Sequence, residues 1–317
     1  MRVLITGITG FIGDALAKKL LKKGYDVYGL IRFTSTTRKL IDDVKYITGD
    51  LNDYHSVAQA VRLSRPEIVV HLGAITPVSE SFHQPILYAE TNYIGTINLL
   101  EAIRKYAFEQ VMLVLIAGTT EMYSTKDPID ENTPFNPVSP YGVSKVAAVL
   151  YAEYVWQTYK IPVIIAIPCN TYGRANVYQK HFVIEKIITS MLERKPKILM
   201  GRPDVIRDFM FRDDHVNAYL SIIENVIDKG KTEIIGQRFV FGTGKAYSIK
   251  EVFELCKKLI GWEGEVKWNV FVRPNEPEVI KTNPSKAMRV LGWKPQYSLE
   301  NGLKRAIEEW KKVLEIK

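Results

Sequence analysis

Residues 1–13 read MRVLITGITGFIG, and this stretch decides the fold. The apolar run at residues 3–6 predicts a short buried strand, and the spacing of apolar residues over 11–21 predicts an amphipathic helix. A strand that passes into a helix through a glycine-rich turn is typical of the first unit of a parallel α/β sheet.

The turn between this strand and helix carries Gly7, Gly10 and Gly13. Glycine permits a tight turn and lets backbone N–H groups approach a ligand, and a helix N-terminus stabilises a negative charge placed on it. Because strand, glycines and helix follow one another in the required order, the segment predicts a site for the pyrophosphate of a dinucleotide. An ordinary tight turn is the alternative.

Apolar runs continue to alternate with helical patterns along the first half of the chain. Further buried strands are expected at residues 27–30, 46–48, 68–71, 112–116 and 163–167, and helices at 56–63, 88–106 and 141–159. This order predicts an α/β fold with a doubly wound parallel sheet, the Rossmann arrangement, which binds ligands at the carboxyl ends of its strands.

The regular alternation of expected strands and helices ends after Pro168. A loop at 172–179, a helix at 182–193, a strand at 239–241, a helix at 249–259 and a final helix are expected there, separated by turn-rich and proline-rich segments. We therefore expect a dinucleotide-binding domain at residues 1–168 and a smaller lobe at 169–317 that closes over it. Later segments, within about 207–242, are candidates to return to the first domain.

The composition indicates a cytoplasmic chain that needs no external cross-links. Of its 317 residues 46% are apolar, which is ample for a core, and neither a signal peptide nor an apolar run of about 18 residues is visible. Two cysteines, Cys169 and Cys256, are too few for a disulfide framework. The net charge of +8 lies largely near helix ends, so we expect phosphorylated substrates but neither a nucleic acid nor a membrane as partner.

The residues after the second expected strand indicate which dinucleotide binds. An acidic residue about 20 positions beyond the glycines would bind the ribose 2′-hydroxyl of NAD, but Arg32 and its neighbours stand there. Arg32, with Arg38 and the hydroxyl groups around it, offers donors to the 2′-phosphate of NADP. NADP is therefore favoured, with NAD possible; arginines that only face solvent are the alternative. Asp50, in GDLND, is expected to contact the adenine, although an ordinary turn residue would look the same.

Tyr141 and Lys145, in SPYGVSK, stand one helical turn apart, so their side chains share a face. A phenol that removes a proton near neutral pH needs a pKa about three units below its usual value of about 10. A lysine ammonium and a positive nicotinamide together supply that shift. A surface pair of Tyr and Lys is the alternative. The preceding strand ends in AGTTEMY, which adds Thr119 and Glu121 at the carboxyl edge of the sheet.

With these residues assembled, the chain resembles the extended short-chain dehydrogenase/reductase family, and within it the nucleotide-sugar epimerases and dehydratases. The resemblance covers nearly the whole chain. It rests on TGITGFIG, GDLND, HLGA at residues 71–74, Asn92, Thr119, the Tyr141 and Lys145 pair, Asn170, RDFMFRDDH from Arg207, and RPNEPEV from Arg273 followed by NPSKA and LGW.

The resemblance implies roles for individual residues. It implies that Tyr141 is the base at O4 of the sugar, that Lys145 lowers its pKa and holds the nicotinamide ribose, and that Thr119 positions O4. Implied contacts to the cofactor are Phe11, Ile12, Leu51, Leu72, Ala74 and Asn92; implied contacts to the substrate are Thr76, Thr120, Asn170, Arg207 and Arg273, the last three on the diphosphate. No metal is implied. A homodimer built from the helices near 88–105 and 141–159 is also implied.

Glu121 favours one reaction within the family. The triplet at 119–121 is similar to the Thr, Ser, Glu of GDP-mannose 4,6-dehydratases, and IRFTSTTRKL resembles their NADP loop. In such enzymes oxidation at C4 makes the C5 proton acidic, a carboxylate removes it, and water leaves from C6. We therefore expect an NADP-dependent 4,6-dehydratase. A UDP-glucose/galactose 4-epimerase, an NADPH-dependent reductase of 4-keto-6-deoxy sugars and a non-catalytic dinucleotide sensor are the alternatives.

Overall fold

Strand β1 (Arg2–Thr6) runs into helix α1 (Phe11–Lys22) across residues 7–10 in the computed structural model, which describes residues 1–35, 40–173 and 180–316. Two compact units form. The first contains Met1–Met122, Ser139–Ile167 and Val216–Phe239; the second contains Tyr123–Val138, Pro168–His215 and Val240–Lys317. Residues 123–138 thus leave the first unit before the expected boundary at 168, and residues 216–239 return to it.

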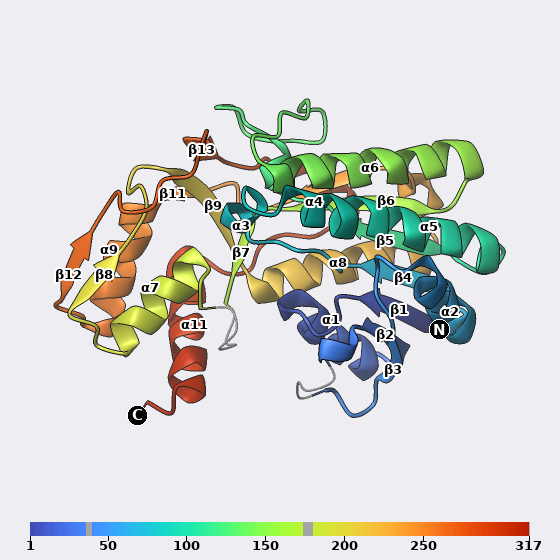
Figure 1. The fold of residues 1–317 in the computed structure, drawn as a ribbon, viewed down its shortest axis with the longest axis horizontal. Helices are drawn as coiled ribbons and strands as arrows, with labels where there is room; N and C mark the ends of the chain where they lie inside the picture. The colour runs from blue at the N-terminus through green and yellow to red at the C-terminus, as the bar shows by residue number, and fades with distance from the viewer. Residues whose placement is uncertain (36–39, 174–179, 317) are drawn as a thin grey trace. The chain divides into compact units, whose positions relative to one another are not determined.

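A seven-stranded sheet organises the first unit in the described part of the chain (Figure 1). In spatial order its strands are β10 (Arg238–Phe241), β6 (Val163–Pro168), β5 (Leu113–Ala117), β4 (Ile68–His71), β1, β2 (Asp26–Ile31) and β3 (Lys45–Thr48). The pairs β3–β2, β2–β1, β1–β4, β4–β5 and β5–β6 are all parallel. The expected doubly wound parallel sheet is confirmed, and the chain reverses its direction of winding between β1 and β4.

Helices cover both faces of this sheet. They are α1, α2 (Tyr54–Ser64), α3 (Val78–Ser81), α4 (Pro85–Tyr88), a π-helical segment (Ala89–Ile94), α5 (Gly95–Tyr106), α6 (Pro140–Tyr159) and α8 (Arg212–Ile227), with 3-10 turns at Phe33–Ser35, Thr120–Met122 and Thr232–Ile234. In Figure 1, α6 and α5 run side by side along the upper part of this unit, and α1 and α8 lie lower in the view. A side-chain hydrogen bond joins α1 to α8, from Lys19 Nζ to Asn217 Oδ1 at 2.7 Å.

The second unit is built around β9 (Ile206–Phe211). This strand pairs with β7 (Asn170–Tyr172), β11 (Ala246–Ser248) and β13 (Val279–Ile280), and a separate ladder joins β8 (Lys197–Leu199) to β12 (Glu265–Lys267). Its helices are α7 (Val183–Leu192), α9 (Ile249–Ile260), α10 (Ser285–Leu291) and α11 (Leu299–Val313). Helices α7, α9 and α11 bury a shared core that includes Met191, Phe253 and Trp310.

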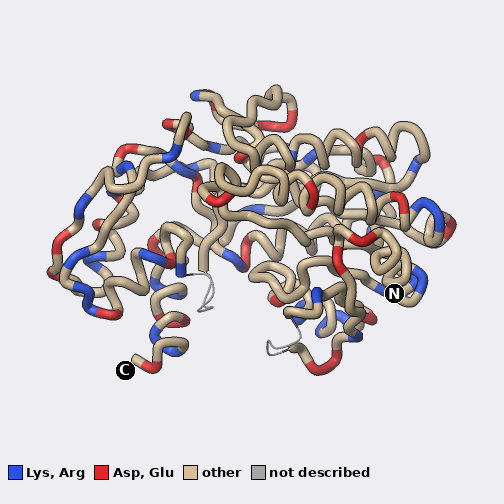
Figure 2. The backbone as a smooth tube through the Cα atoms, in the orientation of Figure 1, with Lys and Arg blue, Asp and Glu red and all other residues tan. Residues whose placement is uncertain are grey.

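Two differences from the expected elements have identifiable causes. The single helix expected at 88–106 is interrupted by the π-helical segment Ala89–Ile94, which places Asn92 toward the sheet. Strand β9 and helix α8 were not expected, because the strand contains Arg207 and Asp208 and the helix begins with a charged segment, and only tertiary partners can bury such residues. Figure 2 shows Lys and Arg interspersed with Asp and Glu along the backbone. None of the described helices has the length and apolar character required to cross a membrane.

Candidate active site

The glycine turn after β1 is closed against the loop that follows β4. Gly7 has φ of 71°, and a Cβ there would lie 2.7 Å from the backbone of Leu72 and of Gly73. A Cβ on Gly13 would collide with the carbonyl of Gly7, and Gly10 N–H donates to that same carbonyl at 2.9 Å. Side chains at these three positions are therefore excluded from the turn. This is the cradle that a pyrophosphate requires.

The residues expected around the rest of the dinucleotide occupy the neighbouring strand ends. Arg32 follows β2 and is exposed, whereas Arg38 lies outside the described residues. The Asp50 carboxylate accepts from Asn52 N–H at 2.9 Å, so it forms a turn of its own while remaining exposed. Leu51 packs against Gly73, where a Cβ would lie 2.7 Å from its Cδ1. The segments after β1, β3 and β4 thus meet at one edge of the sheet.

A buried hydrogen-bond chain fixes the end of β4. Thr96 Oγ1 donates to the Asn92 carbonyl at 2.6 Å, so it accepts from His71 Nε2–H at 2.9 Å. The other ring nitrogen, Nδ1, then accepts from Thr6 Oγ1–H at 2.7 Å, while Thr6 accepts from Gly73 N–H at 3.0 Å. Burial, together with the charge of Lys145, lowers the pKa of His71 to about 3. His71 therefore stays neutral and ties the end of β1 to the end of β4.

Asn92 forms hydrogen bonds both to the loop after β4 and to helix α6. Its Oδ1 accepts from Ile75 N–H at 2.8 Å, and its Nδ2 donates to the Ile75 carbonyl and to Ser144 Oγ, both at 3.0 Å. Ser144 Oγ in turn donates to the Tyr141 carbonyl at 2.7 Å. The side-chain amide is thus occupied by protein groups. It positions both the loop after β4 and the first turn of α6.

Tyr141, Thr119, Glu121 and Lys145 come together at the start of α6. Tyr141 is 7% exposed, Lys145 is 4% exposed, and Glu121 is 7% exposed. The side chain of Thr119 hydrogen-bonds to the Tyr141 phenol, and the ring of Tyr88 meets the Tyr141 ring edge to face at 6.2 Å. Helix α6 begins here because Ser139 Oγ caps it, accepting from Gly142 N–H at 3.1 Å. Thr120 is buried beside this group, and Thr76 is exposed.

The electrostatics of the phenol are set mainly by burial. Burial raises the pKa of Tyr141 above its ordinary value, the hydrogen bond to Thr119 lowers it, and the charges of Glu121 and Tyr88 raise it further. The lowered phenol pKa expected from the sequence is therefore not supplied by the described side chains alone. A positive charge beside the phenol, such as that of an oxidised nicotinamide, would lower it.

Burial of the Lys145 ammonium is energetically unfavourable, and this leads to a prediction about stability. Burial lowers its pKa from 10.5 to about 8. Because the folded pKa lies below the unfolded one, the buried ammonium destabilises the protein fully below pH 8, and the penalty disappears as pH rises from 8 to 10.5. We expect Lys145→Met to increase the free energy of unfolding at pH 7 by up to about 3 kcal/mol.

Denaturant unfolding of both proteins at pH 7 and above pH 10 measures this gain, which should vanish at the higher pH. Lys229→Met, at an exposed lysine of the same unit, is the matched control and should give no pH-dependent gain. A constant difference between Lys145→Met and the parent at both pH values would contradict the assigned burial penalty.

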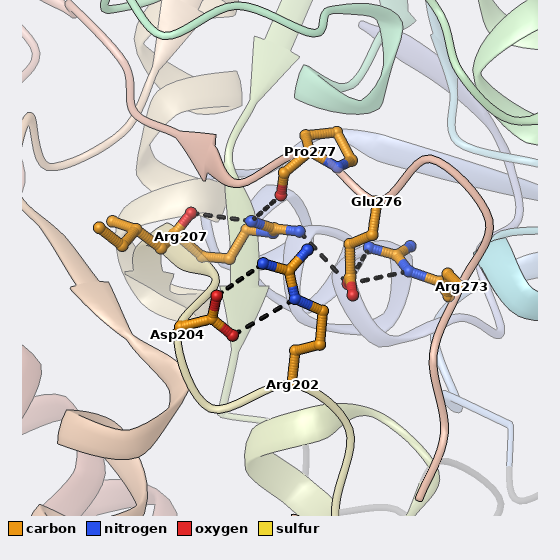
Figure 3. Close-up of polar contacts among 7 residues, drawn as sticks. Arg202, Asp204, Arg207, Arg273, Glu276 and Pro277 are labelled. Atoms are coloured by element: carbon orange, nitrogen blue, oxygen red, sulfur yellow. Dashed lines mark hydrogen bonds and ion pairs between the residues drawn. The ribbon is translucent and has the colours of Figure 1, made fainter. Parts of the chain in front are cut away.

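The arginines expected to hold the diphosphate lie together in the second unit, where they share one carboxylate (Figure 3). Arg273 donates to Glu276 Oε1 through Nε at 3.0 Å and Nη2 at 2.7 Å, and Arg207 Nη2 reaches the same oxygen at 3.4 Å. Arg207 Nη1 also donates to the carbonyls of Ile206 and Pro277, both at 2.9 Å. The Arg207 side chain is 4% exposed and that of Arg273 is 24% exposed. Two guanidinium groups thus converge on a single anionic oxygen.

Asn170 stands at the start of β7, paired in register with Phe209 of β9. Its Oδ1 is buried and has no hydrogen-bond partner among the described residues. A buried amide oxygen left in this state is costly, so it marks a place where a polar ligand is favoured.

Sequence reasoning missed several residues that support this arrangement. His71 was noticed only as part of HLGA, and neither its partners Thr6 and Thr96 nor Ser144 gave any local signal. Glu276 lies within RPNEPEV, three residues after Arg273, which was the one available hint that the two side chains pair.

Comparison with known proteins identifies the family. The family model described as GDP-mannose 4,6 dehydratase matches residues 4–306. A relative from Methanocaldococcus jannaschii, named a putative UDP-glucose 4-epimerase, is 32% identical over 313 residues, which cover 98% of each chain. GDP-mannose 4,6 dehydratase 1 from Arabidopsis thaliana is 31% identical over 330 residues, which cover 96% of this chain and 88% of the relative.

A solved structure agrees with these relatives. The crystal structure of the UDP-glucose 4-epimerase of Thermus thermophilus in complex with NAD matches with a TM-score of 0.87 and 27% identity, covering 98% of this chain and 99% of that one. The resemblance drawn from the motifs is confirmed. The chain is therefore an enzyme of the GDP-mannose 4,6-dehydratase family, within the nucleotide-sugar epimerases and dehydratases of the extended short-chain dehydrogenase/reductase type.

Proposed function

We propose that the chain is an NADP-dependent 4,6-dehydratase of a nucleotide-diphosphate sugar. The observation that carries this proposal is the buried carboxylate of Glu121 placed within electrostatic reach of the Tyr141 phenol, whose pKa it raises. Dehydration needs a second base besides the one at O4, whereas exchange of configuration at C4 does not. A carboxylate so close to the O4 base supplies that second base.

Each side chain of this cluster takes one part of the reaction. Tyr141 removes the proton of the sugar 4-hydroxyl, Thr119 holds that oxygen, and Lys145 favours the phenolate with its charge. Glu121 then removes the proton at C5 and passes a proton to the C6 hydroxyl, which leaves as water. Bound NAD(P) would supply the redox chemistry, in which a hydride leaves C4 and is delivered to C6. The side-chain-free turn at Gly7, Gly10 and Gly13 fits its pyrophosphate.

Residues of the second unit bind the nucleotide part of the substrate. Arg207 and Arg273 already enclose one anionic oxygen, that of Glu276, and phosphate oxygens offer the same charge to the same donors. The buried Oδ1 of Asn170 offers an acceptor for a substrate hydroxyl or amide. Thr76 and Thr120 are assigned to the sugar. The relatives named above act, by their names, on UDP-glucose and GDP-mannose, which supports a nucleotide sugar without choosing the base.

A 4-epimerase is the second candidate, because the M. jannaschii relative and the T. thermophilus structure both carry that name. Mass spectrometry of the products from a panel of nucleotide sugars decides between the two. Loss of water supports the dehydratase, and an unchanged mass with inverted configuration at C4 supports the epimerase. A product that forms only with added NADPH would instead indicate a reductase.

The preference for NADP depends on Arg32, which is exposed at the end of β2 in the place where an acidic residue would bind the 2′-hydroxyl of NAD. We expect Arg32→Ala to weaken NADP binding about 10- to 100-fold, because a charge-assisted contact to the 2′-phosphate is lost, and to change NAD binding little. Calorimetric titration of both cofactors measures the two affinities. An equal loss for both, or tighter binding of NAD by the parent protein, would contradict the NADP assignment.

The proposal also includes a homodimer. Large apolar side chains are exposed in a row on α6, at Val143 (54%) and Leu150 (50%), and on the adjoining segment, at Ile86 (72%) and Ile94 (42%). Helix α6 packs against this segment and against α5, so the exposed side chains extend across neighbouring helices of one unit. Pairing of these helices with a second copy would bury them as a four-helix bundle. Light scattering gives the mass that tests this.

A further inference from the structure

A loop at residues 268–276, which leads from β12 to the arginine cluster, exposes an apolar run. Val270 is 36% exposed, Phe271 is 56% exposed and Val272 is 61% exposed. Three consecutive exposed apolar side chains are unusual next to a cluster of charges, and an exposed aromatic ring is the group that stacks on a planar ligand.

The backbone on either side holds Phe271 in a defined position. Asn269 N–H donates to the Gly201 carbonyl and Val270 N–H donates to the Met200 carbonyl, both at 3.0 Å. The carbonyl of Phe271 approaches Gly201 so closely that a Cβ there would lie 2.8 Å away. Asn269, with φ of 59°, and Asn275, with φ of 49°, bracket the loop in left-handed conformations. The loop therefore presents the ring on a fixed support, which lowers the entropy cost of stacking.

A cation lies over one face of the Phe271 ring, and more than half of the side chain is exposed. The ammonium of Lys186, on α7, lies 4.7 Å from the ring centroid, and its Nζ donates to the Leu199 carbonyl at 2.7 Å. With one face taken by a cation, the exposed part of the side chain is the part that a planar ligand can reach.

The neighbouring guanidinium groups indicate the class of planar ligand. Arg273 is two residues from Phe271, so their Cα atoms are at most about 7 Å apart, which is within the span of one nucleotide. The guanidinium groups of Arg207 and Arg273 suit a diphosphate, and a base joined to that diphosphate through a ribose would extend away from them. Groups that can bind a diphosphate and a ring that can stack on a base thus lie close together in the second unit.

We propose that Phe271 is the stacking platform for the nucleobase of the sugar nucleotide. This inference rests on the proposed function, since it assigns the base to the side of the diphosphate opposite the sugar. Stacking tolerates any base because each presents a flat face, so Phe271 contributes affinity and not the choice between guanine and uracil.

Binding of three probes to the full chain separates stacking from charge: GDP, UDP and inorganic pyrophosphate, each measured by calorimetry. We expect Phe271→Ala to weaken GDP and UDP about 5- to 100-fold and to leave pyrophosphate unchanged. Phe271→Trp should retain nucleotide affinity, and the fluorescence of its added indole should fall when GDP binds. Phe108→Ala, at an exposed phenylalanine of the first unit, should change nothing.

The outcomes separate this inference from the function on which it rests. Unchanged nucleotide affinity in Phe271→Ala, or an equal loss for pyrophosphate, would overturn the stacking role while leaving the nucleotide-sugar function intact. Failure of the parent protein to bind either nucleotide would overturn the proposed function itself. Loss of nucleotide affinity in Phe271→Trp would also contradict stacking, since indole stacks at least as well as phenyl.

Discussion

Replacing Tyr141 by phenylalanine is expected to reduce turnover of the nucleotide sugar by at least a factor of about 10² to 10⁴, the usual contribution of a positioned acid or base. The hydroxyl that would be removed is buried, hydrogen-bonded to Thr119 and electrostatically coupled to Glu121. Removing it deletes the proton acceptor for O4 without altering the ring that packs edge to face on Tyr88. The loss should therefore fall on turnover and not on folding.

The measurement compares turnover, dinucleotide affinity and the unfolding midpoint in the parent protein and in Tyr141→Phe. Dinucleotide affinity should persist because the glycine turn and the His71 chain do not involve the hydroxyl. Tyr151→Phe is the matched control: it removes a hydroxyl from the same helix, one that donates to Glu101 at 2.9 Å, and it should retain full turnover. Retained turnover in Tyr141→Phe would remove the basis of the proposed reaction.

The elements of the first unit could be predicted from the sequence because they depend on patterns among residues that are close together in the chain. Strands buried on both faces of a parallel sheet appear as short apolar runs, and the glycine turn has a conformation that few other residues can adopt. Helical spacing alone placed Tyr141 and Lys145 on one helix, and both are buried on α6. Their electrostatic state was not predictable, because it depends on burial and on Thr119, Glu121 and Tyr88, which come from other elements.

Strand β9 illustrates what local reasoning could not supply. Its sequence IRDFMF places two charged residues inside a strand. Asp208 is buried because it accepts hydrogen bonds from the backbone of Thr243 and Gly244 and from the Thr282 hydroxyl, while Arg207 donates to two carbonyls. These partners lie 35 to 74 positions away from Asp208 in the chain, so only the folded second unit turns a charged segment into a central strand.

The identity of the reaction depends most on Glu121, and Glu121→Gln tests it directly. If the enzyme is a dehydratase, glutamine cannot remove the C5 proton, so formation of the dehydrated product should fall about 10²- to 10⁴-fold. In deuterium oxide the parent enzyme should also place solvent deuterium at C5, because the proton held by a carboxylate can exchange before it is used. Mass spectrometry of the product reads both effects, and Glu109→Gln, at an exposed carboxylate of the same unit, should change neither.

A structural role for the same carboxylate predicts a different result. The charge of Glu121 raises the pKa of Tyr141, so its removal should shift the acidic limb of the pH–rate profile to lower pH whichever reaction is catalysed. An epimerase would show that shift while keeping its maximal turnover and incorporating no deuterium. A dehydratase would show the shift only in the small residual rate, because the lost step lies at C5 and not at O4. Full turnover in Glu121→Gln on the best substrate would therefore exclude dehydration and leave epimerisation, or reduction if turnover requires added NADPH.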